Sequence, residues 1–284
     1  MKVTPMTMNI IERNFYRLLR SGAFGTEEVI EPMSVWKWGR LYHLSEMHDV
    51  AMYIYKGIEH CSDQFFVQIP QELDEQWRQA ATEEASSDEE QNGQEGKNDL
   101  LASDHLTNPL LNYQLQSMLD SENSNTETRT ALLHLVGTCR FIMNAGIPVK
   151  RITELGIFLR QPGNRIDHTT LGQWIKKLKL ESMVQLVSVM LVKLLNFKPE
   201  ELPFMQPTSE EKMDKQLREL FQMRNSHAEE WYFSQGKNIF VHTSNSQAML
   251  WHVRRSARYF RYYPTETVTN FLTSFAHSLS HIEE

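Results

Sequence analysis

One stretch of the sequence carries apolar residues on two faces of a helix, and it constrains the fold more than any other feature. A helix that is apolar on two sides must be covered on both sides, because apolar surface left in water destabilises the folded chain. The chain is therefore predicted to pack several helices around this one. Its apolar residues are Met183, Leu186, Val187, Met190, Leu191, Leu194 and Leu195.

Apolar residues at helical spacing predict helices along most of the remaining chain. We expect a helix over Asn9–Arg20 that ends at Gly22, and a second helical region that Ser34 caps and that continues through Ile58. Only Ile239–Thr243 is a candidate strand. The predicted fold class is therefore mainly α, a multi-helix bundle with little or no sheet. Further helices are expected at residues 71–81, 127–144 and 149–160, after a cap at Asp167 or Thr169, and at 209–223, 247–262 and 264–281.

A strongly acidic stretch with almost no apolar residue separates two helical regions. Between Thr82 and Asp99 there are seven Asp or Glu residues and one lysine, so most of the chain's net charge of −7 lies there. Such a stretch cannot bury enough apolar surface to offset the entropy of ordering it. We therefore expect a disordered acidic linker over residues 82–105, between an N-terminal helical region over 1–81 and a C-terminal helical domain over 106–284.

Cysteine content and hydropathy predict a cytoplasmic protein with no membrane partner. Cys61 and Cys139 lie in apolar periodic stretches, and two cysteines are too few for a disulfide framework. No apolar run approaches the roughly 18 residues that a membrane-spanning helix needs. Charged residues also interrupt the first twenty residues, where a signal peptide would be continuously apolar.

The sequence lacks the motifs of the common catalytic centres. A polymerase-beta-type nucleotidyltransferase needs a Gly-Ser or Gly-Gly turn for the triphosphate and paired carboxylates for magnesium, and this chain has no such turn. Two pairs of carboxylates are spaced two residues apart and begin with Asp: Asp88 with Glu90, and Asp120 with Glu122. Both pairs lie in polar sequence that is typical of solvated charges. No Walker A loop, dinucleotide fingerprint or nucleophile elbow is present either. No catalytic residue and no metal ligand is therefore predicted.

Basic residues are densest in one stretch near the end of the chain. Arg254, Arg258 and Arg261 fall on one face of a helix and are interleaved with aromatic residues. Such a face can pair with carboxylates of a neighbouring helix, which is the first expectation. It can also bind a phosphate or an acidic partner, or capture the acidic linker. We call these three residues the arginine face.

Three blocks of sequence resemble a family of bacterial nucleotidyltransferases, a polymerase-beta-like group in which long helical regions surround a small catalytic sheet. The first block is FYRLLRSGAFG at Phe15–Gly25, together with Trp36 and the sequence around Tyr42 and Val50. The second block runs from His134 through FIMNAGIPVKRITELGIFL to Leu202–Phe204. The third block is RRSARYFRYYPTETV. The resemblance implies structural roles for the residues that match family positions, which are Gly146, Lys150, Glu154, Pro264 and Glu266.

The chain departs from that family where the catalytic centre would be. In place of the family's magnesium-binding carboxylates it has the acidic linker and a short stretch up to about Asn125. The resemblance therefore implies a degenerate member without the catalytic palm, and the expected function is a non-catalytic binding or scaffolding protein with no cofactor. A protein partner is expected, and a full-length family member is one candidate. Near-neutral charge outside the linker argues against nucleic acid.

Two alternatives stay open from the sequence. One is a nucleotidyltransferase whose active site is unconventional or completed by a partner chain, for which Mg²⁺ would be the cofactor. The other is a regulatory module that binds nucleic acid or phosphate through the arginine face.

Overall fold

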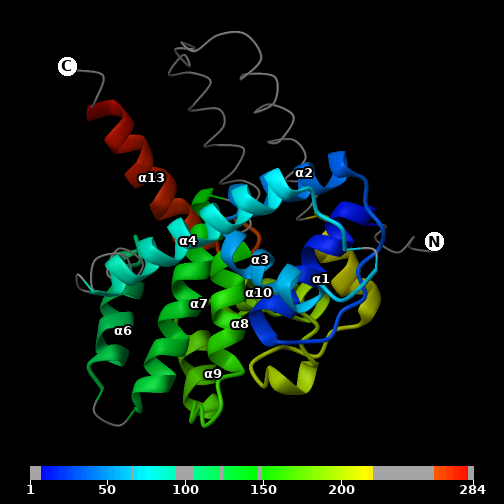
Figure 1. Cartoon of the computed structure of the whole chain (residues 1–284). Helices are drawn as coiled ribbons and strands as arrows, with labels where there is room; N and C mark the ends of the chain where they lie inside the picture. Colours follow the sequence, from blue (N-terminus) through cyan, green and yellow to red (C-terminus); the bar gives the residue numbers. More distant parts are fainter. Residues whose placement is uncertain are drawn as a thin grey trace. The chain divides into compact units, whose positions relative to one another are not determined.

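The structure, a computed structural model, describes residues 8–65, 67–93, 105–121, 124–145, 149–219 and 259–280 (Figure 1). The chain is mainly α-helical, as the apolar spacing predicts, and within these ranges every regular element is a helix. The candidate strand at Ile239–Thr243 and most of the helix expected at 247–262 lie outside the described residues.

The chain divides into two compact units, and these differ from the contiguous regions expected from the sequence. The first unit is Met1–Asp99, Pro148–Asn164 and Met190–Glu201, and the second is Leu100–Ile147, Arg165–Val189 and Leu202–Glu284. The expected split into 1–81, 82–105 and 106–284 missed this interleaving because it followed composition alone. Tertiary contacts decide it instead: the Arg20 guanidinium donates to the carbonyl oxygen of Leu194 at 2.9 Å, within the first unit.

The first helix, α1 (Ile10–Phe24), begins at a capping box. The Asn9 side chain accepts the backbone N–H groups of Ile11 and Glu12, and the Glu12 carboxylate accepts the N–H of Asn9. The expectation that Gly22 ends this helix is wrong, since α1 continues to Phe24. It ends at Gly25, whose φ of 65° is the left-handed conformation that glycine adopts most readily.

Gly22 instead lets α1 pack very closely against α3 (Ala51–His60). A Cβ atom at Gly22 would lie 1.8 Å from the Tyr53 carbonyl oxygen, and one at Gly57 would lie 2.1 Å from the Leu18 carbonyl oxygen. Each glycine therefore sits against the backbone of the opposite helix, and no larger residue fits at either position.

The helical region expected from Ser34 through Ile58 is two helices. Ser34 is the N-cap of α2 (Val35–Met47), as predicted, but its side chain makes no capping hydrogen bond. The chain then turns at Asp49, which has a positive φ of 51°, and α3 begins at Ala51. A non-glycine residue in this conformation breaks a helix, and the apolar periodicity on both sides hides the break.

The helix α4 (Gln71–Gly93) is much longer than expected and takes in the first half of the predicted linker. Trp77 and Ala81 are buried on its inner side. Beyond them, the Glu84 carboxylate accepts the N–H of Met52 at 3.0 Å, in the first turn of α3. The helix therefore continues to Gly93 into the stretch where the sequence predicts a linker, and a partly buried polar contact at Glu84 docks its first turn there. Residues 94–104 lie outside the described residues.

The remaining helices follow the predicted positions more closely. In the first unit, Val149–Leu159 is α8, and in the second unit α9 is capped by Asp167, one of the two caps that the sequence offers. The stretch before Asn125 contains a helix that was not predicted, α6, which starts with an Asn108 cap and Pro109. The two-faced apolar stretch is α10, and its seven apolar residues are all buried. The bounds are α6 (Pro109–Leu119), α7 (Thr126–Ala145), α9 (His168–Lys177), α10 (Glu181–Leu195), the 3-10 turn η1 (Pro199–Glu201) and α13 (Pro264–Ser280).

Candidate functional site

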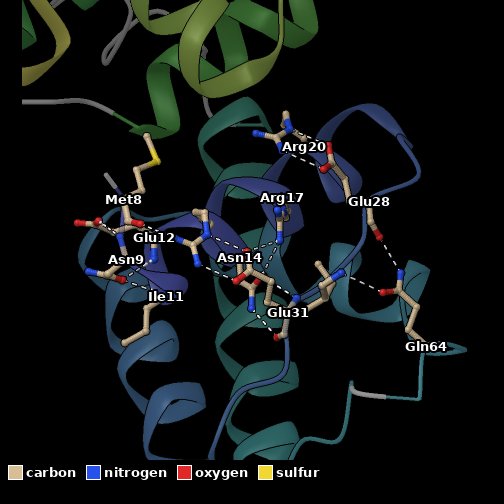
Figure 2. Close-up of polar contacts among 12 residues, drawn as sticks. Met8, Asn9, Ile11, Glu12, Asn14, Arg17, Arg20, Glu28, Glu31 and Gln64 are labelled. Carbon is tan, nitrogen blue, oxygen red and sulfur yellow. Dashed lines mark hydrogen bonds and ion pairs between the residues drawn. The ribbon is translucent and has the colours of Figure 1, made fainter. Parts of the chain in front are cut away.

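Three arginines of α1 form a network with two carboxylates of the loop that follows the helix (Figure 2). Glu31 lies between two arginines one turn apart: its carboxylate accepts from Arg13 through two nitrogens at 2.7 Å and from Arg17 at 2.8 Å. These hydrogen bonds, with the Arg13 bond largest, lower the pKa of Glu31 to about 2. Because the carboxylate is already held by two cations, it has the character of an ion-pair partner rather than of a general base.

A second ion pair lies one turn further along α1. The Arg20 guanidinium binds the Glu28 carboxylate through two nitrogens at 2.7 and 2.9 Å, and both side chains are nearly buried. The Gln64 side chain holds the same loop by donating to the Glu28 carbonyl oxygen and accepting the N–H of Ile30 (Figure 2). The three arginines of α1 therefore fasten the loop after the helix onto it.

Of the residues that match the nucleotidyltransferase family, Lys150 and Glu154 lie on α8. The Lys150 ammonium is 3.5 Å from the Glu84 carboxylate, whose other oxygen accepts the Met52 N–H. Lys150 therefore links α8 to α4, and Glu154 is half-buried in the next turn of α8. Gly146 lies outside the described residues.

Pro264 and Glu266 both lie in the first turn of α13. Pro264 is the first residue of the helix, where its missing N–H and fixed φ are favourable. The Glu266 side chain is buried, and its carboxylate accepts the N–H and hydroxyl of Thr107 at 2.6 and 2.8 Å and the N–H of Asn108 at 3.0 Å. Glu266 therefore fixes the start of α6.

The arginine face is described only at Arg261, since Arg254 and Arg258 lie outside the described residues. The Arg261 guanidinium donates to the Glu219 carboxylate at 2.7 Å and to the Tyr262 hydroxyl at 2.6 Å. Arg261 therefore makes the carboxylate pairing that is expected first, while the placement of all three arginines on one face stays a prediction.

The structure describes the two carboxylate pairs of the sequence only in part. Asp88 and Glu90 lie in the last turns of α4, Asp120 is the C-cap residue of α6, and Glu122 lies outside the described residues. The part of the chain that the structure describes contains no group of three or more His, Cys, Asp or Glu residues that could hold a metal ion.

An exposed stripe of large side chains runs along the outer side of α2, and sequence reasoning missed it. Trp36 is 68% exposed and Met47 is 51% exposed. Arg40 lies between them with its guanidinium carbon 5.9 Å from the centre of the Trp36 ring, and His43 is also exposed. The spacing i, i+4, i+7 and i+11 places all four on one face, which we call the α2 stripe.

The opposite side of α2 is packed into the first unit. Trp38 and Leu41 are fully buried and Leu44 nearly so, and the Trp38 ring meets the Trp77 ring of α4 edge-on at 6.2 Å. Two tryptophans two residues apart therefore have opposite surroundings. The sequence separates them only by side: Trp36, Arg40, His43 and Met47 share a helical face that excludes Trp38.

Comparisons with known proteins leave the function to be argued from the chain itself. No protein family, curated protein or solved structure matches the chain. A membrane-crossing helix is also not found among the described residues, since none of their helices combines the necessary length with the necessary hydropathy.

Proposed function

We propose that this chain is a non-catalytic binding protein and that the α2 stripe is the surface on which a protein partner docks. The observation that carries the proposal is a tryptophan left 68% exposed on a helix whose other face is firmly packed. Exposing so large an apolar side chain is unfavourable in an isolated protein. Tryptophan and arginine are also the residues most enriched among those that dominate binding energy at protein interfaces.

The charges on α2 indicate the chemistry of that partner. Lys37 and Arg40 lie along the helix, and its one acidic residue, Glu46, already accepts the Tyr42 hydroxyl at 2.7 Å and lies 3.4 Å from the His43 ring nitrogen. A partner surface with an apolar centre and acidic side chains beside it would complement this face. Three less exposed carboxylates of the first unit support a non-catalytic role as well, since Glu28, Glu31 and Glu84 are held in ion pairs.

Site-specific photo-crosslinking tests the docking surface in the cell that makes the protein. A photoreactive amino acid replaces Trp36 in one variant and Glu83 in a matched variant, because Glu83 is an exposed helical residue of the same unit. We expect one discrete adduct from position 36 whose crosslinked peptide is acidic and whose yield falls at least tenfold with Arg40→Ala. Equal adducts from both positions, or a basic crosslinked peptide, would contradict the proposal.

Activity measurements test the non-catalytic part of the proposal separately. The purified chain is incubated with Mg²⁺ and each nucleoside triphosphate, and pyrophosphate release is followed. We expect no release above a protein-free control. Turnover that disappears on replacing Asp88, Glu90 or Asp120 with alanine would favour a nucleotidyltransferase with an unconventional site instead.

A further inference from the structure

The second unit carries an exposed basic segment, made of α9 and the residues just before and after it, whose charge is opposite to that of the whole chain. Residues 165–179 contain four Lys or Arg residues and one acidic residue, whereas the chain as a whole has a net charge of −7. The acidic residue, Asp167, is occupied as the N-cap of α9: its carboxylate accepts the N–H groups of Thr169 and Thr170 and the Thr170 hydroxyl. The basic residues are Arg165, Lys176, Lys177 and Lys179, all exposed.

The inner side of α9 is held firmly, so its outer side is presented in a fixed orientation. Leu171, Trp174 and Ile175 are buried. At the start of the helix, the N–H of Asp167 donates to the Thr128 hydroxyl of α7 at 2.8 Å, and the Asn125 side chain donates to the Arg165 carbonyl oxygen. At its end, the buried Tyr263 hydroxyl donates to the Leu178 carbonyl oxygen at 2.8 Å.

The outer side of α9 carries polar groups suited to reading bases as well as cations suited to phosphates. His168, Thr169 and Gln173 are exposed, and they precede the lysines on the same side of the helix. Glutamine can bind adenine through two hydrogen bonds, and the threonine methyl can contact the thymine methyl in the major groove. Gly172 has open space where a Cβ would be, so the backbone there can approach a ligand closely.

We infer that α9 is a docking surface for double-stranded DNA, with the helix entering the major groove. An α-helix fits that groove, which is about 12 Å wide, and ten residues of helix span about 15 Å. Lys176, Lys177 and Lys179 at one end and Arg165 at the other would contact phosphates on the two sides of the groove. The following helix, α10, is buried on several sides, so α9 is the helix of this pair that can reach DNA. This inference goes beyond the proposed protein-binding function and does not depend on it.

Fluorescence anisotropy with a labelled 20-base-pair duplex of mixed sequence tests the inference on the full chain. Lys176→Ala with Lys177→Ala removes two cations from α9, and Lys212→Ala with Lys215→Ala removes two exposed cations elsewhere in the same unit. Each phosphate contact contributes about 0.9 to the slope of log affinity against log salt. We expect wild-type binding at 50 mM NaCl, an affinity about tenfold lower for the α9 variant, and a salt slope reduced by about 2. The control variant should bind within twofold of wild type.

Three outcomes would overturn the inference. The first is no anisotropy change for the wild-type chain at 50 mM NaCl. The second is an equal loss in both double variants, which would reflect net charge and not a surface on α9. The third is tighter binding to single-stranded RNA of the same length that depends on the same lysines, which would make the ligand RNA. Gln173→Ala adds a readout of base contact: we expect an unchanged salt slope and a smaller preference between A·T-rich and G·C-rich duplexes.

Discussion

At the scale of single residues, this chain uses its less exposed carboxylates to hold helix ends and loops. Glu84 accepts an N–H at the start of α3, and Glu266 accepts two N–H groups at the start of α6. Glu28 and Glu31 bind arginines of α1. A carboxylate beside apolar sequence is often taken for a catalytic group. Here each of these carboxylates binds a backbone donor or a cation that would otherwise have no partner in the fold.

Glu31 gives the residue-scale prediction, because its lowered pKa makes its contribution depend on pH. Glu31→Gln removes the charge that Arg13 and Arg17 share, and at pH 7 we expect a loss of about 1 kcal/mol of unfolding free energy, as for a partly exposed ion pair. The folded-state pKa of about 2 lies below the ordinary value of 4.5. The contribution is therefore complete above pH 4.5 and is lost as the pH falls toward 2.

Urea unfolding at pH 7, 4 and 2.5 measures this difference. The wild-type and Glu31→Gln curves should differ most at pH 7 and converge at the lowest pH. Glu27→Gln is the matched control, since Glu27 is an exposed neighbour, and it should leave stability within about 0.5 kcal/mol at each pH. A Glu31→Gln effect that is constant over this range would show that the charge is not what Glu31 contributes.

The hydrogen-bond and ion-pair partners of individual residues were harder to predict from the sequence than any other feature of this protein. The start of α9, with Asp167 as one of two candidate caps, and Pro264 at a helix start were predicted, because capping depends on neighbours in the chain. The partners of Glu84 and Glu266 were not, because they lie 32 and 159 residues away in sequence. The α2 stripe was missed for a related reason: periodicity shows that Trp36 and Trp38 lie on different sides of a helix, but not which side is covered.

At the scale of elements, the packing of α1 against α3 depends on two glycines. Each one allows the backbone of the other helix to approach where any side chain would collide. Sequence reasoning treated Gly22 as the end of a helix, because glycine is common at that position. The same residue type serves inside helices where two backbones meet, and only the opposite helix distinguishes the two uses.

Gly22→Ala should therefore be strongly destabilising, although alanine favours helix. The added Cβ would lie 1.8 Å from the Tyr53 carbonyl oxygen, so α1 and α3 must separate and lose packing. We expect a loss of about 3 kcal/mol of unfolding free energy. Gly39→Ala on α2 is the control, since nothing lies within 4 Å of the place its Cβ would take, and it should stabilise the protein by about 0.5–1 kcal/mol. Thermal unfolding of both variants measures the contrast, and a Gly22→Ala loss below about 1 kcal/mol would contradict the close crossing.

Most helix positions followed from apolar spacing, and two of the departures from it are instructive. The break at Asp49 was hidden because apolar residues continue in register on both sides of it. The extension of α4 to Gly93 was hidden because its sequence is polar, and polar sequence is typical of linkers. The burial of Trp77 and Ala81 anchors that helix, and one turn further on the Glu84 carboxylate accepts the Met52 N–H.

At the scale of the whole molecule, the first unit is assembled from three separate stretches of chain. A fragment of residues 1–147 lacks two of them and should leave α1 unprotected in amide hydrogen exchange. A fragment of residues 1–201 contains all three, and we expect the amides of α1 to exchange at least tenfold more slowly in it. Equal exchange in the two fragments would show that residues 1–99 fold without the later stretches.

The contact between Arg20 and the Leu194 carbonyl oxygen has a consequence for how the protein is made. The two residues are 174 positions apart, so α1 leaves the ribosome long before Leu194 has been synthesised. At about 5–20 residues per second, the nascent helix waits roughly 9–35 s for that carbonyl oxygen. During this interval the apolar side of α1 has only part of its final cover, and chaperones can bind it. Translation speed between residues 99 and 194 should therefore govern how much of the newly made protein aggregates.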